Sequence, residues 1–205
     1  MENEQGGLSP ARIETLCDGV FAIAMTILVL ELHVPDPVPG LDLAASLRHL
    51  WPKVASYAVS FVILGTLWVG HHYQFHFMRR SDRALLWINL FFLLFVSFLP
   101  FATALVGSFP GERLAVLTYG CTLMGAGLCL LAQWEYASRG GRLVAASADG
   151  PVVGAIRARV VAGTMFYAAA TLTGIWSPAA ALVMFAVMPI LYLLPTRIDR
   201  HVKGA

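Results

Sequence analysis

The chain has 205 residues, of which 58% are hydrophobic and only 13% are charged, and its mean hydropathy is +0.71. Soluble domains usually carry about 25% charged residues, so this composition excludes a disordered chain and an ordinary cytosolic enzyme. The net charge of +2 is too small to indicate a nucleic acid as a partner.

Six apolar stretches come close to the roughly 20 residues that a helix needs to cross a bilayer. They leave no room for a separate soluble domain, so residues 1–205 are predicted to form one all-α integral membrane domain with six transmembrane helices. The last two stretches are short and are expected to form a tight hairpin, because only Ser177 separates them. The predicted spans are residues 13–33, 54–75, 84–106, 114–136, 160–176 and 178–194.

Most positive charges lie on one side of these spans. An even number of spans puts both termini on the same side, and Lys and Arg are enriched on the cytoplasmic side of membrane proteins. Both termini are therefore predicted to be cytoplasmic in a multi-pass protein of the cell membrane. The side of the termini holds Arg12, Arg79, Arg80, Arg83, Arg139, Arg142, Arg157, Arg159, Arg197, Arg200 and Lys203, and the other side holds Arg48, Lys53 and Arg113.

The first span contains an acidic residue, Asp18, in an otherwise apolar helix. A charge inside a span costs about 2.5–3.5 kcal/mol on insertion scales, so Asp18 is expected to face protein and not lipid. Ile23, Ile27 and Leu30 share another face, about 140° from Asp18 at 100° per residue. The acidic side chain and the aliphatic stripe therefore point in different directions.

Two interpretations of this stripe remain open. Ile23, Ile27 and Leu30 are either ordinary packing or lipid-facing residues, or they line a pore as rings of side chains in an oligomer. Hydrophobic constrictions of the second kind gate channels by dewetting. Periodicity does not separate the two interpretations, because every spanning helix has apolar faces.

The second and third spans offer polar partners for the buried charge. His71 and Asn89 lie near the same end of their helices as Asp18, so a hydrogen-bonded cluster of these three residues is predicted. No metal site is predicted, because His71 and His72 point about 100° apart on a helix and further ligands are missing. The cysteines are expected to be small buried apolar residues; they are Cys17, Cys121 and Cys129.

Three motifs in the first half of the chain resemble one known family. The segment Arg12-x-x-x-Leu16-Cys17-Asp18 resembles the R-x-x-x-F-S-D signature of the transmembrane protein 175 family of potassium channels. It departs from that signature at Leu16, where Phe is usual, and at Cys17, where Ser is usual. The other two motifs are Trp68-x-x-His71-x-x-x-Phe75, and Asn89-Leu90 followed by Phe98-Leu99-Pro100.

This resemblance implies a bacterial-type chain of one six-helix unit, located in the inner membrane, whose first helices surround the pore of a homotetramer. It implies that Ile23 forms the tightest ring, that Ile27 and Leu30 form further rings, and that Thr26 tunes selectivity. It also implies a network that holds the first helix against the next two, made of Arg12, Leu16, Cys17, Asp18, Trp68, His71 and Asn89.

An aliphatic ring supplies no ligand to an ion. The sequence has no Thr-Val-Gly-Tyr-Gly filter loop, so only modest selectivity is expected, set by pore width and dehydration cost. Glu31 is either an ordinary helix-end charge or an outer-mouth residue that raises the local cation concentration. The expected partners are potassium ions, membrane lipids and further copies of the chain, without a cofactor.

Two other functions are weaker hypotheses. A secondary transporter would use Asp18 and His71 as a proton relay, but the sequence has no inverted repeat. A membrane enzyme needs converging nucleophiles, bases or ligands, and the candidates are too few: Asp18, His71, His72 and Glu135. The residues and the resemblance together favour a potassium-conducting cation channel.

Overall fold

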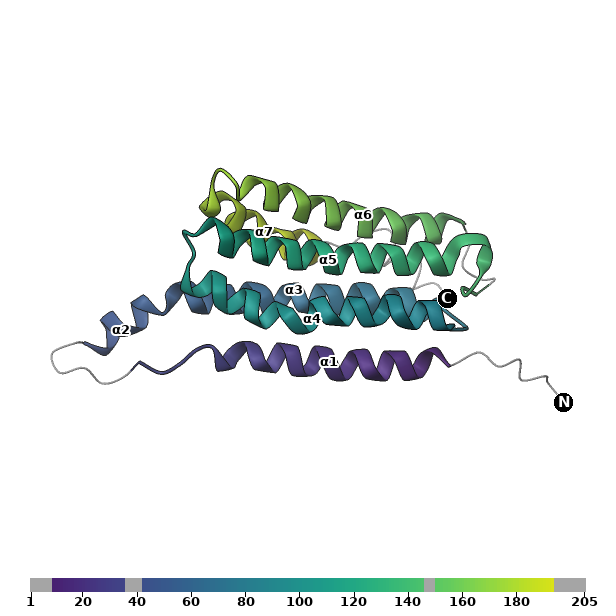
Figure 1. Ribbon diagram of the computed structural model, residues 1–205, viewed down its shortest axis with the longest axis horizontal. Coiled ribbons are helices and arrows are strands. Elements are labelled where there is room, and N and C mark those ends of the chain that lie inside the picture. The colour runs from purple at the N-terminus through teal and green to yellow at the C-terminus, as the bar shows by residue number, and fades with distance from the viewer. Residues whose placement is uncertain (1–8, 36–41, 146–149, 194–205) are drawn as a thin grey trace.

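The computed structural model describes residues 9–35, 42–145 and 150–193. These residues form a bundle of helices that run roughly parallel or antiparallel to one another (Figure 1). The helices are α1 (Pro10–Leu30), α2 (Leu43–His49), α3 (Trp51–His76), α4 (Arg83–Ser108), α5 (Arg113–Ser138), the short 3₁₀ turn η1 (Arg139–Gly141), α6 (Gly150–Thr173) and α7 (Pro178–Leu193).

Five of the described helices are long and apolar enough to cross a membrane, namely α1, α3, α4, α5 and α6. The described part of α7 is apolar and has 16 residues. The first four predicted spans are confirmed as helices with closely similar bounds. Pro10 occupies the first turn of α1, where its missing N–H is not needed and its fixed φ favours the helix.

α6 begins earlier than predicted, at Gly150 and not near residue 160. Sequence analysis assigned Arg157 and Arg159 to a loop because they are charged, whereas both lie on α6. Arg157 forms an ion pair with Glu135 of α5. The Arg159 guanidinium lies 4.0 Å from the centre of the Tyr192 ring and donates a hydrogen bond to the Tyr192 carbonyl oxygen at 3.1 Å. These contacts accommodate both charges on a helix.

α2 was not predicted, because a seven-residue helix is far shorter than a membrane span. It lies between α1 and α3, beyond the end of the bundle (Figure 1). Leu43 and Leu47 are exposed on it, four residues apart and therefore on one face.

The helices are arranged in three layers (Figure 1). α1 forms one outer layer, α3 and α4 form the middle layer, and α5, α6 and α7 form the opposite outer layer. α1 packs against α3 and α4. The start of α1, the α3–α4 turn and the α5–α6 connection lie at one end of the bundle, and the α4–α5 and α6–α7 turns lie at the other.

The α5–α6 contact depends on small residues. A Cβ atom at Gly127 would lie 2.6 Å from the Oγ1 atom of Thr164, and one at Gly120 would clash with Thr171. Both threonine hydroxyls donate to carbonyl oxygens of their own helix, so the glycines face largely apolar surfaces. Small residues of this kind let membrane helices approach closely.

The α3–α4 turn and the α5–α6 connection are joined to each other. Met78 and Val144 form an isolated antiparallel bridge, and the Ala145 amide donates to the Phe77 carbonyl oxygen at 2.8 Å. This backbone pairing fastens the middle layer to the layer of α5, α6 and α7 at the end where α1 begins.

Asp82 adds a side-chain link at the same end. Its carboxylate accepts hydrogen bonds from the Leu85 amide at 2.9 Å and from the Tyr136 hydroxyl at 2.6 Å. Partial burial alone would raise the pKa of this carboxyl, but the hydrogen bonds and the nearby Arg142 guanidinium outweigh it, so its pKa lies below the usual value. Asp82 thus caps α4 while it holds α5.

Candidate functional site

One face of α1 is buried against the middle layer. The buried residues recur every three or four positions, as expected for one side of a helix: Ile13, Cys17, Phe21, Ala24 and Leu28. The Phe21 ring lies 5.8 Å from the Phe92 ring of α4. This contact sets the rotation of α1 about its own axis.

The opposite face of α1 is open in the single chain. It carries the predicted aliphatic stripe, with exposed fractions of 60% for Ile23, 39% for Ile27 and 67% for Leu30. Thr26 is exposed beside the stripe, and its hydroxyl donates to the carbonyl oxygens of Ala22 and Ile23, both at 2.9 Å. The hydroxyl is therefore bonded within the helix. The described chain leaves this face uncovered.

Cys17, His71 and Asn89 form the polar contact between α1, α3 and α4. The Asn89 Nδ2 group donates to the Cys17 Sγ atom at 3.3 Å, and the thiol donates to Asn89 Oδ1 at 3.4 Å. The His71 Nε2 atom lies 2.9 Å from the same Oδ1 atom, which can only accept, so Nε2 carries the proton. All three side chains are buried.

The predicted cluster of Asp18, His71 and Asn89 is therefore wrong in one member. Cys17 occupies the place assigned to Asp18, because consecutive residues of a helix point about 100° apart. Asp18 is exposed, and it accepts a hydrogen bond at 2.8 Å from the indole nitrogen of Trp68. The acid still contacts α3, but at the edge of the α1 interface and not inside it.

Aromatic rings enclose His71. The imidazole stacks on Phe75 of its own helix, with ring centres 4.4 Å apart, and on Phe92 of α4, with ring centres 5.4 Å apart and planes within 3° of parallel. Trp68 stacks in a similar way on His72, at 5.7 Å. His71 is therefore a packing residue whose Nε2 atom donates to Asn89, with the Cys17 Sγ atom also within 3.4 Å of it.

Two members of the expected packing network lie outside it. Arg12 and Leu16 are exposed on the same side of α1 as Ile23. Their spacing of 11 and 7 residues from Ile23 amounts to about three and two helical turns. Of the four α1 residues in the expected network, Cys17 and Asp18 contact the middle layer, and Arg12 and Leu16 do not.

The remaining predictions have mixed outcomes. Glu31 is exposed directly after the last residue of α1, and its role at an outer mouth stays a prediction. Of the cysteines, Cys17 is buried, but Cys121 is exposed and Cys129 is only partly buried, so the expectation for these two is wrong. Within the described residues, no group of three or more His, Cys, Asp or Glu side chains is placed to hold a metal ion.

Sequence analysis missed two other buried polar contacts. Ser60 bonds to the Tyr119 hydroxyl at 2.9 Å and accepts from Thr103 at 2.8 Å. Gln133 donates to Gln74 at 2.9 Å, with both amides fully buried. Isolated polar residues within apolar spans were the signal, since such residues in membrane helices turn toward protein partners.

Comparisons with known proteins point to one family. The family model described as the endosomal/lysosomal potassium channel TMEM175 matches residues 12–100. A protein of Streptomyces collinus that is named a potassium channel is 36% identical over 169 residues, which cover 80% of this chain and 80% of that protein. The chain belongs to the TMEM175 family.

Further matches to TMEM175 relatives extend beyond the first half of the chain. A protein of Chamaesiphon minutus named a potassium channel is 38% identical over 150 residues, 71% of this chain and 74% of that protein. The crystal structure of a lysosomal potassium-selective channel TMEM175 homolog from Chamaesiphon minutus matches with a TM-score of 0.82 and 31% identity. It covers 90% of this chain and 96% of the other, so the TMEM175 likeness includes the layer of α5, α6 and α7.

Proposed function

We propose that this chain is a potassium-conducting cation channel of the cell membrane, in which the α1 helices of four identical subunits line the pore. The observation that carries the proposal is the open face of α1, with Ile23 at its centre. Membership of a family whose model is described as a potassium channel makes K⁺ the expected permeant ion. The family is one of channels, so the chain is not an enzyme.

The chemistry of the open half of α1 supports an assembly of copies. Besides the aliphatic stripe it exposes the Asp18 carboxylate, about two turns inside the helix. Lipid would impose the cost of about 2.5–3.5 kcal/mol on that charge. In an assembly around a water-filled axis, neighbouring subunits would instead contact one part of the open half of α1, and water would contact the other part.

In this arrangement Ile23 forms the constriction, and Ile27 and Leu30 form further rings toward the outer mouth. Such rings conduct when the pore widens and water enters it. Because their side chains do not coordinate the ion, selectivity for K⁺ is modest. Thr26 lies beside the rings and would tune the passage of partly hydrated ions. Glu31 at the mouth would attract cations.

The topology forms part of the same proposal. Residues 1–205 would be one channel domain with six spans, in which α7 pairs with α6 as the sixth. The 16 described residues of α7 account for about 24 Å at about 1.5 Å per residue, against a hydrocarbon core of roughly 30 Å. In a bacterial inner membrane, the positive-inside rule would place the start of α1 on the cytoplasmic side.

The decisive experiment is potassium flux from liposomes that contain purified protein. Ile23→Asn replaces an aliphatic ring with amides that water wets, so K⁺ flux is expected to rise by about tenfold, equivalent to roughly 1.4 kcal/mol in the barrier. Leu172→Asn is the matched control, because Leu172 is similarly exposed but lies on α6, away from α1. It should leave the flux unchanged.

Two results would contradict the proposal. One is no flux above empty liposomes from either the wild type or Ile23→Asn. The other is an equal change in Ile23→Asn and Leu172→Asn, which would mean that α1 has no special position relative to the ions.

The structure does not support the proton relay that the transporter hypothesis requires. The His71 Nε2 proton is directed at Asn89, and the Asp18 carboxylate is bonded to the Trp68 indole, which is not a proton carrier at ordinary pH. No hydrogen bond joins Asp18 to His71 among the described contacts, so no observation favours this second function.

A further inference from the structure

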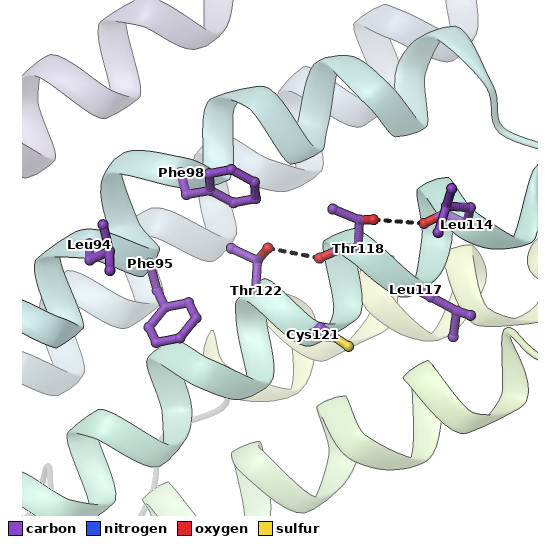
Figure 2. A pocket seen from close by; sticks show the side chains of 8 residues that line it. All are labelled: Leu94, Phe95, Phe98, Leu114, Leu117, Thr118, Cys121 and Thr122. Atoms are coloured by element: carbon purple, nitrogen blue, oxygen red, sulfur yellow. Dashed lines mark hydrogen bonds between the residues drawn. The ribbon is translucent and has the colours of Figure 1, made fainter.

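A groove of about 540 Å³ lies on the surface between α4 and α5. Figure 2 shows side chains of both helices around it. The aliphatic and aromatic ones that matter here are Leu94, Phe95 and Phe98 of α4, and Leu114 and Leu117 of α5. The volume falls within the roughly 300–1,000 Å³ of typical ligand sites.

The groove is chemically apolar. Its two threonines do not offer their hydroxyls to a ligand, because Thr118 donates to the Leu114 carbonyl oxygen at 2.8 Å and Thr122 to that of Thr118 at 2.7 Å (Figure 2). No charged residue lines it. This lining best fits a hydrocarbon segment.

The groove has the depth of one leaflet. Leu114 is the second residue of α5, at the end of the bundle, whereas Leu94 lies near the middle of α4. Along α5 it runs from Leu114 to Thr122, eight residues or about 12 Å, and half of a hydrocarbon core is about 15 Å. Arg113 is exposed at the open end, at the depth of lipid head groups.

Phe95 lines the groove near the middle of α4. Its ring lies so close to Gly125 of α5 that a Cβ atom on Gly125 would clash with it. The glycine therefore lets the Phe95 ring approach α5 closely. A groove that runs from the end of the bundle to the middle of α4 fits the end of one acyl chain.

The groove lies where lipid is the available occupant. α5 belongs to the layer on the far side of the bundle from α1 (Figure 1). If α1 faces the axis, as the proposed function states, the α5 side faces the periphery of the assembly. This single step rests on the proposed function; the shape and chemistry of the groove do not.

We propose that the groove between α4 and α5 binds one acyl chain of a phospholipid, whose phosphate lies near Arg113. The chain enters from the head-group level beside Leu114 and ends at the Phe95 ring. Binding is noncovalent, and each methylene group of the acyl chain that packs in the groove adds to the affinity. Glu112 next to Arg113 limits the preference for anionic over zwitterionic head groups.

Photolabelling tests this site in the full-length protein. Purified protein in vesicles of phosphatidylglycerol receives a trace of the same lipid with a diazirine in mid-chain, and labelled peptides are mapped. Label is expected to concentrate on the segments that contain Leu94 and Cys121. In Cys121→Trp, which adds bulk from an exposed groove residue, it should fall by about tenfold, since loss of about two buried methylenes has that effect.

Two further variants complete the experiment. Gly125→Ala displaces the Phe95 ring, which lines the groove, and should reduce labelling without adding bulk at the surface. Leu172→Trp is the control, because Leu172 is exposed near the same end of the bundle, on α6. It should leave groove labelling unchanged, and a K⁺ flux assay on the same vesicles reports separately on the proposed channel.

Three outcomes would overturn the acyl-chain site. Label spread evenly over exposed faces and insensitive to Cys121→Trp would indicate ordinary bulk lipid. Equal losses in Cys121→Trp and Leu172→Trp would indicate a general effect on the protein. Unlabelled groove peptides, together with bis-maleimide cross-linking between Cys121 thiols of two copies, would make the groove an interface between subunits. Loss of K⁺ flux with groove labelling retained would count against the channel alone.

Discussion

Cys17 places a sulfur atom at the point where three helices meet. Asn89 presents both an acceptor and a donor there, and it bonds to the Cys17 thiol and to His71 at once. The thiol is a weaker hydrogen-bond partner than a hydroxyl, but it fills the space completely, with no exposed surface. The spacing of residues predicted a polar cluster at this depth, but it did not predict the member from α1, because that depends on helix rotation.

Substitutions at Cys17 separate packing from hydrogen bonding. Cys17→Ala leaves Asn89 Nδ2 without a partner and opens a small void, so a loss of about 1–3 kcal/mol of stability is expected. Cys17→Ser keeps a similar volume and a stronger acceptor, and should stay close to the wild type. Thermal melting in detergent, followed by tryptophan fluorescence, measures both. Equal melting temperatures for Cys17→Ala and the wild type would contradict the assigned contact.

The helices differ in how well their bounds could be predicted from their own residues. Inside a bilayer each backbone group must be bonded within its segment, so a long apolar run and a helix coincide. This is why α1, α3, α4 and α5 were predicted with nearly correct bounds. The start of α6 was not, because Arg157 is accommodated by Glu135, more than twenty residues away in sequence. α2 lies outside any membrane-length pattern.

The α5–α6 pair gives a prediction at this scale. Gly127→Ala introduces a Cβ atom 2.6 Å from Thr164 Oγ1, so the helices must separate or Thr164 must rotate, at an expected cost of about 1–3 kcal/mol. Gly154→Ala on α6 is the control, since nothing lies within 4 Å of its Cβ position. It should be neutral or stabilising by up to about 1 kcal/mol. Chemical denaturation in mixed micelles compares them, and equal effects would refute the close approach.

The assembly of layers and copies lies beyond single-sequence reasoning. The stripe of Ile23, Ile27 and Leu30 was predicted as one face, and the structure leaves that face open. Whether lipid, water or protein covers this face depends on contacts with other chains. The hydrophobic periodicity of one sequence does not reveal such contacts. The same holds for Arg12 and Leu16, whose side of α1 was fixed only when Cys17 and Phe21 were seen packed against the middle layer.

The link between the two larger layers should depend on pH through Asp82. A carboxyl whose pKa is lowered by folding stabilises the folded state while it is ionised. That contribution is complete above the ordinary value of 3.8 and is lost as the pH falls through the lower value of the folded protein. Asp82→Asn keeps an N-cap residue but removes the charge, so its melting temperature should vary less over the acidic range. Identical pH profiles for both proteins would contradict the role of the charge.

The one-sided attachment of α1 has a genetic consequence. In the proposed tetramer each chain contributes one Ile23 side chain to a shared ring, and no chain encloses the ring alone. A cell that makes both a wild-type chain and an Ile23 variant would therefore assemble mostly mixed rings, so the variant should act dominantly on conductance. Variants in the α5–α6 interface, such as Gly127→Ala, disturb folding within one chain and should be recessive.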